Sequence, residues 1–241
     1  MGNSYGGAAP VRMAVLALVA AVMPVAAQAG CDWDDLVRDE AGAATVRSTG
    51  ARVYFVKDDV LHHGCPNDSA ACRGAAYLMA GDAVLTGPAQ GQYVCAGFVG
   101  AKGAQTIGWL PAAAMAPLPE AAQRPSDWAG NWMAPEQELV IAAAAGGALA
   151  VKGDATWGMG DPQRRRTGGI HTGEVAGTAQ AVNGVLAFTM GDDDKTLPYE
   201  AGDEFTCRIR LLRRGPYLIA RDNNACGGVN VSFSGFYRRK S

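Results

Sequence analysis

The sequence has few charged residues and few histidines, and its positive and negative charges nearly balance. Its 241 residues include 18% charged residues, below the usual proportion of about 25%, and only three histidines. The formal net charge is −2, so no overall cationic field draws the protein to nucleic acid or to anionic lipid. These deficits, together with 32 glycines and 12 prolines, argue against a coiled coil, a helical membrane protein and a nucleic-acid-binding protein.

The longest apolar run lies at the N-terminus and predicts a secretory signal peptide over residues 1–29. Arg12 precedes an apolar stretch, residues 13–27, that is shorter than the roughly 20 residues of a membrane-spanning helix. Ala27-Gln28-Ala29 then fits the small-x-small pattern of a signal cleavage site. We therefore expect a mature chain that begins at Gly30, has no transmembrane span, and works in a bacterial periplasm or outside the cell.

Lipidation of Cys31 is the alternative at this point of the chain. Bacterial lipoproteins carry an apolar residue three positions before the modified cysteine, followed by small residues. Ala29 and Gly30 fit that pattern, but Gln28 does not. The cysteine count also opposes lipidation, because all six cysteines could pair in an oxidising compartment, and modifying Cys31 would leave one odd thiol.

The cysteines divide evenly around a proline-rich segment. Residues 111–127 contain four prolines, which argue against a stable helix and for a semi-rigid connector, placed at 119–127. Four cysteines precede it and two follow it, as expected of two domains with separate disulfides. The pairing in the first half stays open, because four cysteines allow three connectivities. The favoured pairs are Cys207–Cys226, Cys65–Cys72 and Cys31–Cys95.

The first half, residues 30–118, is expected to form a short helix followed by a small β-barrel. Residues 32–38 suggest the helix. Five short apolar segments, separated by turn residues and by one long polar loop, predict the strands of such a barrel. These segments are residues 52–56, 75–79, 83–86, 93–99 and 106–110.

The order of these segments resembles a bacterial SH3-like domain over residues 50–118. The matching features are Val53-Tyr54-Phe55, the long loop, Gly81-Asp82 before an apolar strand, Tyr93-Val94 and the ending Gly108-Trp109-Leu110. The resemblance implies an SH3-like barrel and, for the family, the binding of cell-wall peptides or protein partners. The four cysteines and a loop containing His62 and His63 depart from the plain family pattern, so only the fold is carried over.

The second half, residues 128–241, predicts an antiparallel meander of seven or eight strands that closes as a β-barrel. Asn183-Gly184 is a strong signal for a type I′ hairpin turn. The whole chain is therefore expected to be all-β, with a small SH3-like barrel and a second barrel of about eight strands. The expected strands of the second barrel are residues 138–142, 148–153, 169–173, 185–190, 205–212, 217–220 and 229–237.

Two further resemblances concern this second half. Gly130-Asn131-Trp132 resembles the opening of lipocalin-like and avidin-like barrels, in which the tryptophan plugs one end. The last residues of the chain resemble exported proteobacterial proteins. Four residues there loosely resemble the loop of small periplasmic lysozyme inhibitors, although their spacing differs: Ser232, Ser234, Gly235 and Tyr237.

The sequence contains no pattern that predicts an enzyme, a metal site or a cofactor site. Ser232 and Ser234 lack the surroundings of a nucleophile, and Glu174 would lie on the opposite face of a strand from His171. Two histidines precede the cysteines of the long loop, but an oxidising compartment favours a disulfide over thiolate ligands. We therefore expect a protein that catalyses nothing.

Export and a binding-type fold favour a non-catalytic cell-envelope binding protein, whose partner is an envelope protein or peptidoglycan. Two other classes stay open: an inhibitor or immunity protein against a lysozyme-like cell-wall hydrolase, and a carrier of a small hydrophobic ligand. An open barrel would favour the carrier, and a plugged barrel would favour protein recognition. The candidate binding residues are Asn223, Asn224, Gly227, Gly228, Ser234, Tyr237, Arg238 and Arg239.

These candidates lie near the end of the chain, and their side chains are of types that often bind a protein partner. Their asparagine, glycine and arginine side chains suit adaptable hydrogen bonding around Tyr237 as an aromatic anchor. The alternative is that the two glycines merely turn the chain and that Tyr237 merely packs. Trp109, Trp128 and Trp132 are predicted to be structural.

Overall fold

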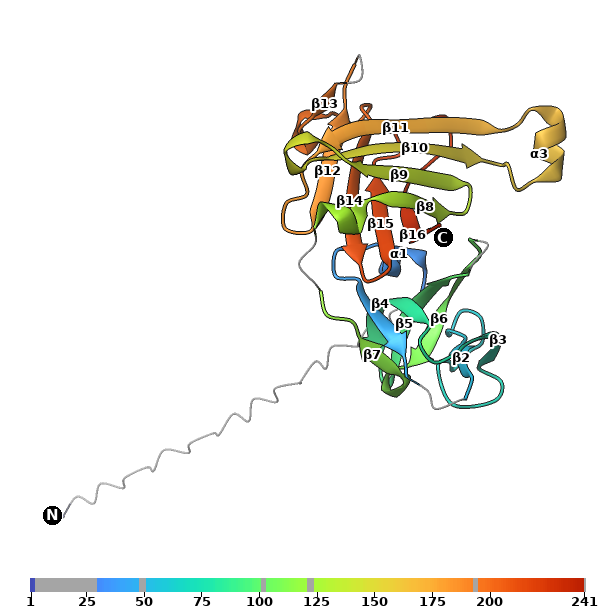
Figure 1. Cartoon of the computed structure of the whole chain (residues 1–241). Coiled ribbons are helices and arrows are strands. Elements are labelled where there is room, and N and C mark those ends of the chain that lie inside the picture. The colour runs from blue at the N-terminus through green and yellow to red at the C-terminus, as the bar shows by residue number, and fades with distance from the viewer. Residues whose placement is uncertain (3–29, 48–50, 101–102, 121–123, 193–194, 241) are drawn as a thin grey trace.

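A computed structural model of the chain contains two antiparallel sheets, so the all-β fold class is confirmed (Figure 1). The described residues are 1–2, 30–47, 51–100, 103–120, 124–192 and 195–240. The expected signal peptide falls on residues 3–29, which lie outside the described residues. No helix in the described ranges is long and apolar enough to cross a membrane.

The first sheet has seven strands in the order β3-β2-β6-β5-β4-β1-β7. Its elements are α1 (Trp33–Leu36), β1 (Gly42–Val46), β2 (Val53–Val56), β3 (Arg73–Leu78), β4 (Ala83–Gln90), β5 (Tyr93–Val99), β6 (Gln105–Pro111), η1 (Ala112–Ala114) and β7 (Met115–Pro117). Five strands match the expected segments, and β1 and β7 are additional. The proline-rich segment can supply β7 because Pro117 ends an edge strand that pairs only with β1, where proline is tolerated.

The second sheet has nine strands in the order β11-β10-β9-β8-β16-β15-β14-β12-β13. Its elements are α2 (Pro125–Trp128), β8 (Gly130–Ala134), β9 (Gln137–Ala143), η2 (Ala145–Gly147), β10 (Leu149–Trp157), α3 (Pro162–Thr167), β11 (His171–Ala179), β12 (Val185–Met190), β13 (Thr196–Leu197), η3 (Tyr199–Ala201), β14 (Arg208–Arg214), β15 (Tyr217–Asp222) and β16 (Gly235–Arg239). The expected barrel of about eight strands is thus a nearly closed barrel of nine, and one of these, β13, has only two residues. The first and last strands, β8 and β16, pair with each other and nearly close it.

The turn between β11 and β12 has the geometry that its sequence predicts. Asn183 and Gly184 have φ angles of 51° and 75°, and a type I′ turn requires positive φ at both central residues. The N–H of Val182 donates to the carbonyl of Val185 at 2.8 Å, and the N–H of Val185 donates to the carbonyl of Val182 at 3.0 Å. These two hydrogen bonds set the register at which β12 begins. This turn is therefore determined locally.

Side chains fill the interior of the second barrel. Its core includes Trp132, Phe188 and Leu211 from three different strands. The segment 229–234 was expected to be part of the last strand, and this expectation is wrong. It instead passes the start of β11, where the carbonyl of Val229 lies 2.5 Å from His171 Nδ1, and it places Val231 and Phe233 in the barrel core.

A third apolar cluster joins the two sheets. The first half contributes Leu36, Cys31 and Cys95 to this cluster. The second half contributes Tyr217 and Phe236. In Figure 1, α1 lies between the two sheets. Polar contacts cross the same junction: the Tyr217 hydroxyl donates to the carbonyl of Ala83 at 2.6 Å, and the Gln105 amide donates to the carbonyl of Phe236 at 2.9 Å. The two halves are therefore packed against each other rather than linked by the connector alone.

All six cysteines form disulfides, and the pairs are those favoured from the sequence. They are Cys31–Cys95, Cys65–Cys72 and Cys207–Cys226. Each bridge lies within one half of the chain. Such disulfides fit an oxidising compartment, which agrees with the expected export.

Three buried tyrosines predict that the protein loses stability at alkaline pH. Burial raises the pKa of Tyr93 and of Tyr217 to about 12, and it raises the pKa of Tyr237 well above 10. In the unfolded chain these phenols ionise near pH 10, so above that pH the unfolded state binds fewer protons than the folded state. We expect the free energy of unfolding to fall by about 2 kcal/mol between about pH 9 and pH 10.5.

Urea unfolding at the two pH values measures this change. The Tyr217→Phe variant keeps the ring and removes one phenol, so its decrease is expected to be smaller by about a third. A free energy of unfolding that stays constant over this range would contradict the expectation.

Candidate functional site

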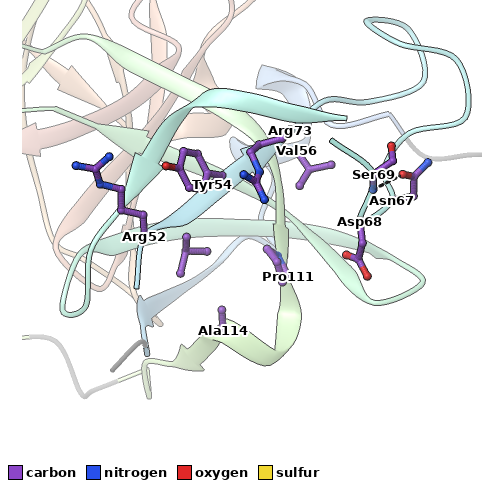
Figure 2. A pocket seen from close by; sticks show the side chains of 10 residues that line it. Arg52, Tyr54, Val56, Asn67, Asp68, Ser69, Arg73, Pro111 and Ala114 are labelled. Carbon is purple, nitrogen blue, oxygen red and sulfur yellow. Dashed lines mark hydrogen bonds between the residues drawn. The ribbon is translucent and has the colours of Figure 1, made fainter. Parts of the chain in front are cut away.

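A groove of about 250 Å³ lies on the first sheet, between β2 and β3 on one side and the long loop and the β6–η1 turn on the other (Figure 2). Both aromatic and charged side chains line it, from segments far apart in the sequence. The lining residues are Arg52, Val53, Tyr54, Val56, Asn67, Asp68, Ser69, Arg73, Pro111 and Ala114.

Beside the groove runs a row of four side chains in the order Arg52, Tyr77, Tyr54 and Arg73, and all of them except Tyr77 line it. Arg52 lies over the ring of Tyr77 at 4.3 Å, and Arg73 lies over the ring of Tyr54 at 5.0 Å. The two tyrosine rings are 5.7 Å apart at an interplanar angle of 55°. Cation–π contacts of this kind help to hold both guanidinium groups in place beside the groove.

The pairing of β2 with β3 creates this row. Tyr54 and Tyr77 are directly opposite each other in the two strands. Because side chains alternate along a strand, Val53 and Phe55 enter the core while Tyr54 points to the other face. Tyr77 keeps 42% of its surface exposed. The row therefore lies on the solvent side of the sheet.

The opposite wall is the loop that the Cys65–Cys72 disulfide closes. Its polar residues are held by hydrogen bonds: the amide of Asn67 donates to the carbonyl of Gly64 at 2.8 Å, and the backbone N–H of Ser69 donates to Asn67 Oδ1 at 2.8 Å. The hydroxyl of Tyr93 donates to the carboxylate of Asp68. The loop thus presents fixed polar atoms across from the arginines and tyrosines.

This arrangement suits the binding of an extended peptide. The groove offers two guanidinium groups, which bind carboxylates through paired hydrogen bonds, and a tyrosine ring, which offers rigid apolar surface. Asp68 and Asn67 add acceptors for backbone or amine N–H groups on the opposite side. A flat apolar ligand would leave these polar groups without partners.

The residues predicted from the sequence to bind a partner are not brought together in one surface. Tyr237 is fully buried, and its hydroxyl has two acceptors within reach of its single proton, Gln137 Oε1 at 2.6 Å and the carbonyl of Phe233 at 2.7 Å. Its ring therefore cannot serve as an exposed anchor. The alternative stated above, that Tyr237 packs within the fold, agrees with this burial.

Other members of the predicted set hold the loop between β15 and β16. Ser234 donates its hydroxyl to Asp222 at 2.5 Å, and the amide of Asn223 donates to the carbonyl of Thr206 at 2.9 Å. Gly228 donates its N–H to Thr172 at the start of β11. These hydrogen bonds fix the loop to the barrel.

The remaining predicted residues lie apart from one another. Asn224 is an exposed turn residue with a φ of 60°, and a Cβ at Gly227 would meet the Cα of Gly173 at 2.6 Å. Arg238 and Arg239 lie at the other end of β16, beside the first sheet. The predicted set therefore splits into a structural loop and a separate basic segment.

The three tryptophans predicted to be structural are all fully buried. Trp109 packs in the cluster shared by both sheets. Trp132 lies in the barrel core and donates its indole N–H to the carbonyl of Trp128 at 2.8 Å. Two arginines cover its ring, Arg213 at 5.0 Å and Arg239 at 4.9 Å.

Sequence reasoning did not find the groove. A signal was present: Arg52 and Tyr54 are two residues apart in a strand, and Arg73 and Tyr77 are four apart, so each pair shares one face. That signal becomes informative only when β2 and β3 are known to pair. His62 and His63, near the same loop, are exposed, and within the described ranges no group of three or more His, Cys, Asp or Glu residues could hold a metal ion.

Comparisons with known proteins found no relative. No family model, no curated protein and no solved structure matches the chain. The SH3-like and lipocalin-like resemblances therefore depend on the residues named above, and any function has to be inferred from the geometry of the groove.

Proposed function

We propose that this chain is an exported, non-catalytic binding protein of the cell envelope, and that its groove recognises a peptide of an envelope protein or of peptidoglycan. The observation that carries the proposal is a groove in which Arg52, Tyr54 and Arg73 lie across from a disulfide-closed loop. Tyr77 lies beside this groove, between Arg52 and Tyr54. A peptide that carries carboxylates would pair with the guanidinium groups and stack on the exposed rings. The three disulfides support the assignment to an oxidising compartment.

The rigidity of both walls supports a binding role. The disulfide and the hydrogen bonds of Asn67 and Ser69 order the loop before any ligand arrives. The cation–π contacts do the same for the arginines. A preordered site loses less conformational entropy on binding, so a peptide can be bound through few contacts.

Replacing Tyr54 or Arg73 by alanine is expected to weaken peptide binding at least tenfold. Aromatic and arginine side chains in a groove are typical hot spots, and truncating one removes about 2 kcal/mol or more of binding free energy. Sedimentation with purified peptidoglycan and titration with soluble wall peptides measure the effect. The matched control is Arg166→Ala, which removes an exposed arginine of α3 on the other sheet.

Two results would contradict the proposal. One is equal binding by the wild type and by the Tyr54→Ala and Arg73→Ala variants. The other is that the wild-type protein binds neither peptidoglycan nor any peptide from digested envelope proteins. Circular dichroism of each variant shows that the fold is intact before binding is compared.

Inhibition of a cell-wall hydrolase is the second candidate function, and the loop between β15 and β16 favours it. Val229 at the tip of this loop is 71% exposed. The Cys207–Cys226 disulfide holds one end of the loop. The other end is held by Ser232, whose hydroxyl donates to the carboxylate of Asp222 at 2.6 Å. A lysozyme-inhibition assay on the same preparation separates this function from peptide binding. The filled barrel core gives no support to a carrier of a hydrophobic ligand.

A further inference from the structure

A second cavity, of about 190 Å³, lies where the two halves of the protein meet. The end of β5 forms one side, and β8 and the end of β16 form the other. Three of its seven lining residues are cationic and none is acidic. The lining residues are Val99, Gly100, Gly103, Met133, Arg238, Arg239 and Lys240.

The backbone and one guanidinium of this basic segment are fixed by bonds across the junction. Arg238 donates from Nη1 to the carbonyl of Val99 in the first sheet at 3.1 Å. The backbone N–H of Lys240 donates to the carbonyl of Asn131 at 2.7 Å. These bonds place the two side chains at the cavity and leave the Lys240 ammonium without a hydrogen bond or ion pair to the described residues.

Arg239 is fixed in a different way. It donates from Nη2 to the carbonyl of Asp127 at 2.6 Å and lies over the ring of Trp132. Arg213 also lies over that ring, and its pKa is lowered by burial and then by the positive charge of Arg239. The positive charges of Arg213 and Arg239 therefore lie close enough to disfavour each other.

Few carboxylates are available to balance these cations. Asp127 favours the charge on Arg213, but its own carboxylate accepts hydrogen bonds from the backbone and side chain of Arg124. Glu138 pairs with Met133 from the next strand and is not part of the lining. Like charges that cluster without counter-charges attract anions, most strongly in a concave site where water is partly excluded.

We propose that this cavity is a binding site for a small anion that carries a phosphate or carboxylate group. The cations converge on one cavity of limited volume, whereas a linear polyanion would need a basic stripe along the surface. The net charge of −2 for the whole chain also disfavours a polymer. Because Val99 belongs to the first sheet and Lys240 follows the last strand of the second, a bound anion would tie the two halves together.

An NMR titration of the full folded chain tests this site. Sodium phosphate and sodium succinate are the two probes, and sodium chloride at matched ionic strength is the control. We expect saturable shifts of the backbone amides of Val99, Gly100, Met133 and Lys240 with at least one of the two probes and not with chloride. The comparison of the phosphate and succinate arms distinguishes the two kinds of anion.

Two variants locate the binding. Lys240→Gln removes a charge that has no hydrogen bond or ion pair to the described residues, and it is expected to weaken anion binding about tenfold, as for the loss of one charge-assisted hydrogen bond. Arg238→Gln is expected to weaken it further, and part of its effect can come from the lost contact to Val99. The matched control, Arg166→Gln, is expected to leave the affinity unchanged.

The proposal is overturned if the shifts grow without saturation, match those with chloride, or persist unchanged in Lys240→Gln. The Tyr54→Ala variant, which changes the peptide groove, is expected to bind the anion as the wild type does. Failure of peptide binding and failure of anion binding are therefore separate results.

Discussion

Replacing Trp132 by alanine is expected to lower the free energy of unfolding by about 3–5 kcal/mol, the range for truncating a buried tryptophan. The side chain is fully buried in the barrel core, and its indole N–H has a partner in the carbonyl of Trp128. Alanine would leave a cavity that the closed barrel can fill only in part. For a chain of this size the melting temperature would fall by roughly 6–20 °C.

The two arginines on the indole ring add to this loss. Arg213 and Arg239 lie over the ring at 5.0 and 4.9 Å, and alanine removes both cation–π contacts. The Trp132→Phe variant is the matched control, because it keeps an aromatic ring at this position while it removes the N–H. We expect its loss of stability to be clearly smaller.

Urea unfolding followed by far-UV circular dichroism measures all three proteins. An unchanged free energy of unfolding for Trp132→Ala would show that the tryptophan does not hold the barrel together. Equal losses in Trp132→Ala and Trp132→Phe would instead assign the effect to the hydrogen bond with Trp128.

Removing the Cys31–Cys95 disulfide is expected to cost about 4 kcal/mol. The bridge joins residues 64 apart in the sequence, and the loop-entropy relation assigns about this value to a loop of that length. Both cysteines are buried in the cluster shared by the two sheets. The double variant Cys31→Ala with Cys95→Ala would therefore also loosen α1, whose Leu36 packs at the junction.

The second disulfide of the same half is the control. Cys65–Cys72 joins residues only 7 apart, so its removal is expected to cost about 2.5 kcal/mol by the same relation. Its main effect should fall on peptide binding, because it closes the loop that forms one wall of the groove. Chemical denaturation of the two double variants, with peptidoglycan sedimentation alongside, separates the two roles. Equal losses of stability would contradict the expected order.

Features that depend on short stretches of sequence could be predicted. The Asn183-Gly184 turn needs positive φ at two adjacent positions, and few residue pairs other than Asn-Gly accept this. Most strands follow from apolar and β-branched runs bounded by glycine and proline. The disulfides follow from an even division of cysteines and from short separations in the cases of Cys65–Cys72 and Cys207–Cys226.

Features that depend on pairing between distant segments could not be predicted. Strand β7 exists because residues 115–117 meet β1, although three alanines and a proline precede it. Residues 229–234 have a strand-like composition, but they leave the sheet to fill the barrel core. In both cases a tertiary contact outweighs local preference.

The same limit applies to the candidate site. Composition and turn chemistry indicate an all-β protein, because both depend on neighbouring residues, and the even division of the six cysteines indicates disulfides within each half. Whether a side chain faces solvent depends instead on which strand lies beside it. For this reason Tyr237, with a chemistry suited to binding, is buried in the core, whereas Tyr54 and Tyr77 become a binding surface only when β2 pairs with β3.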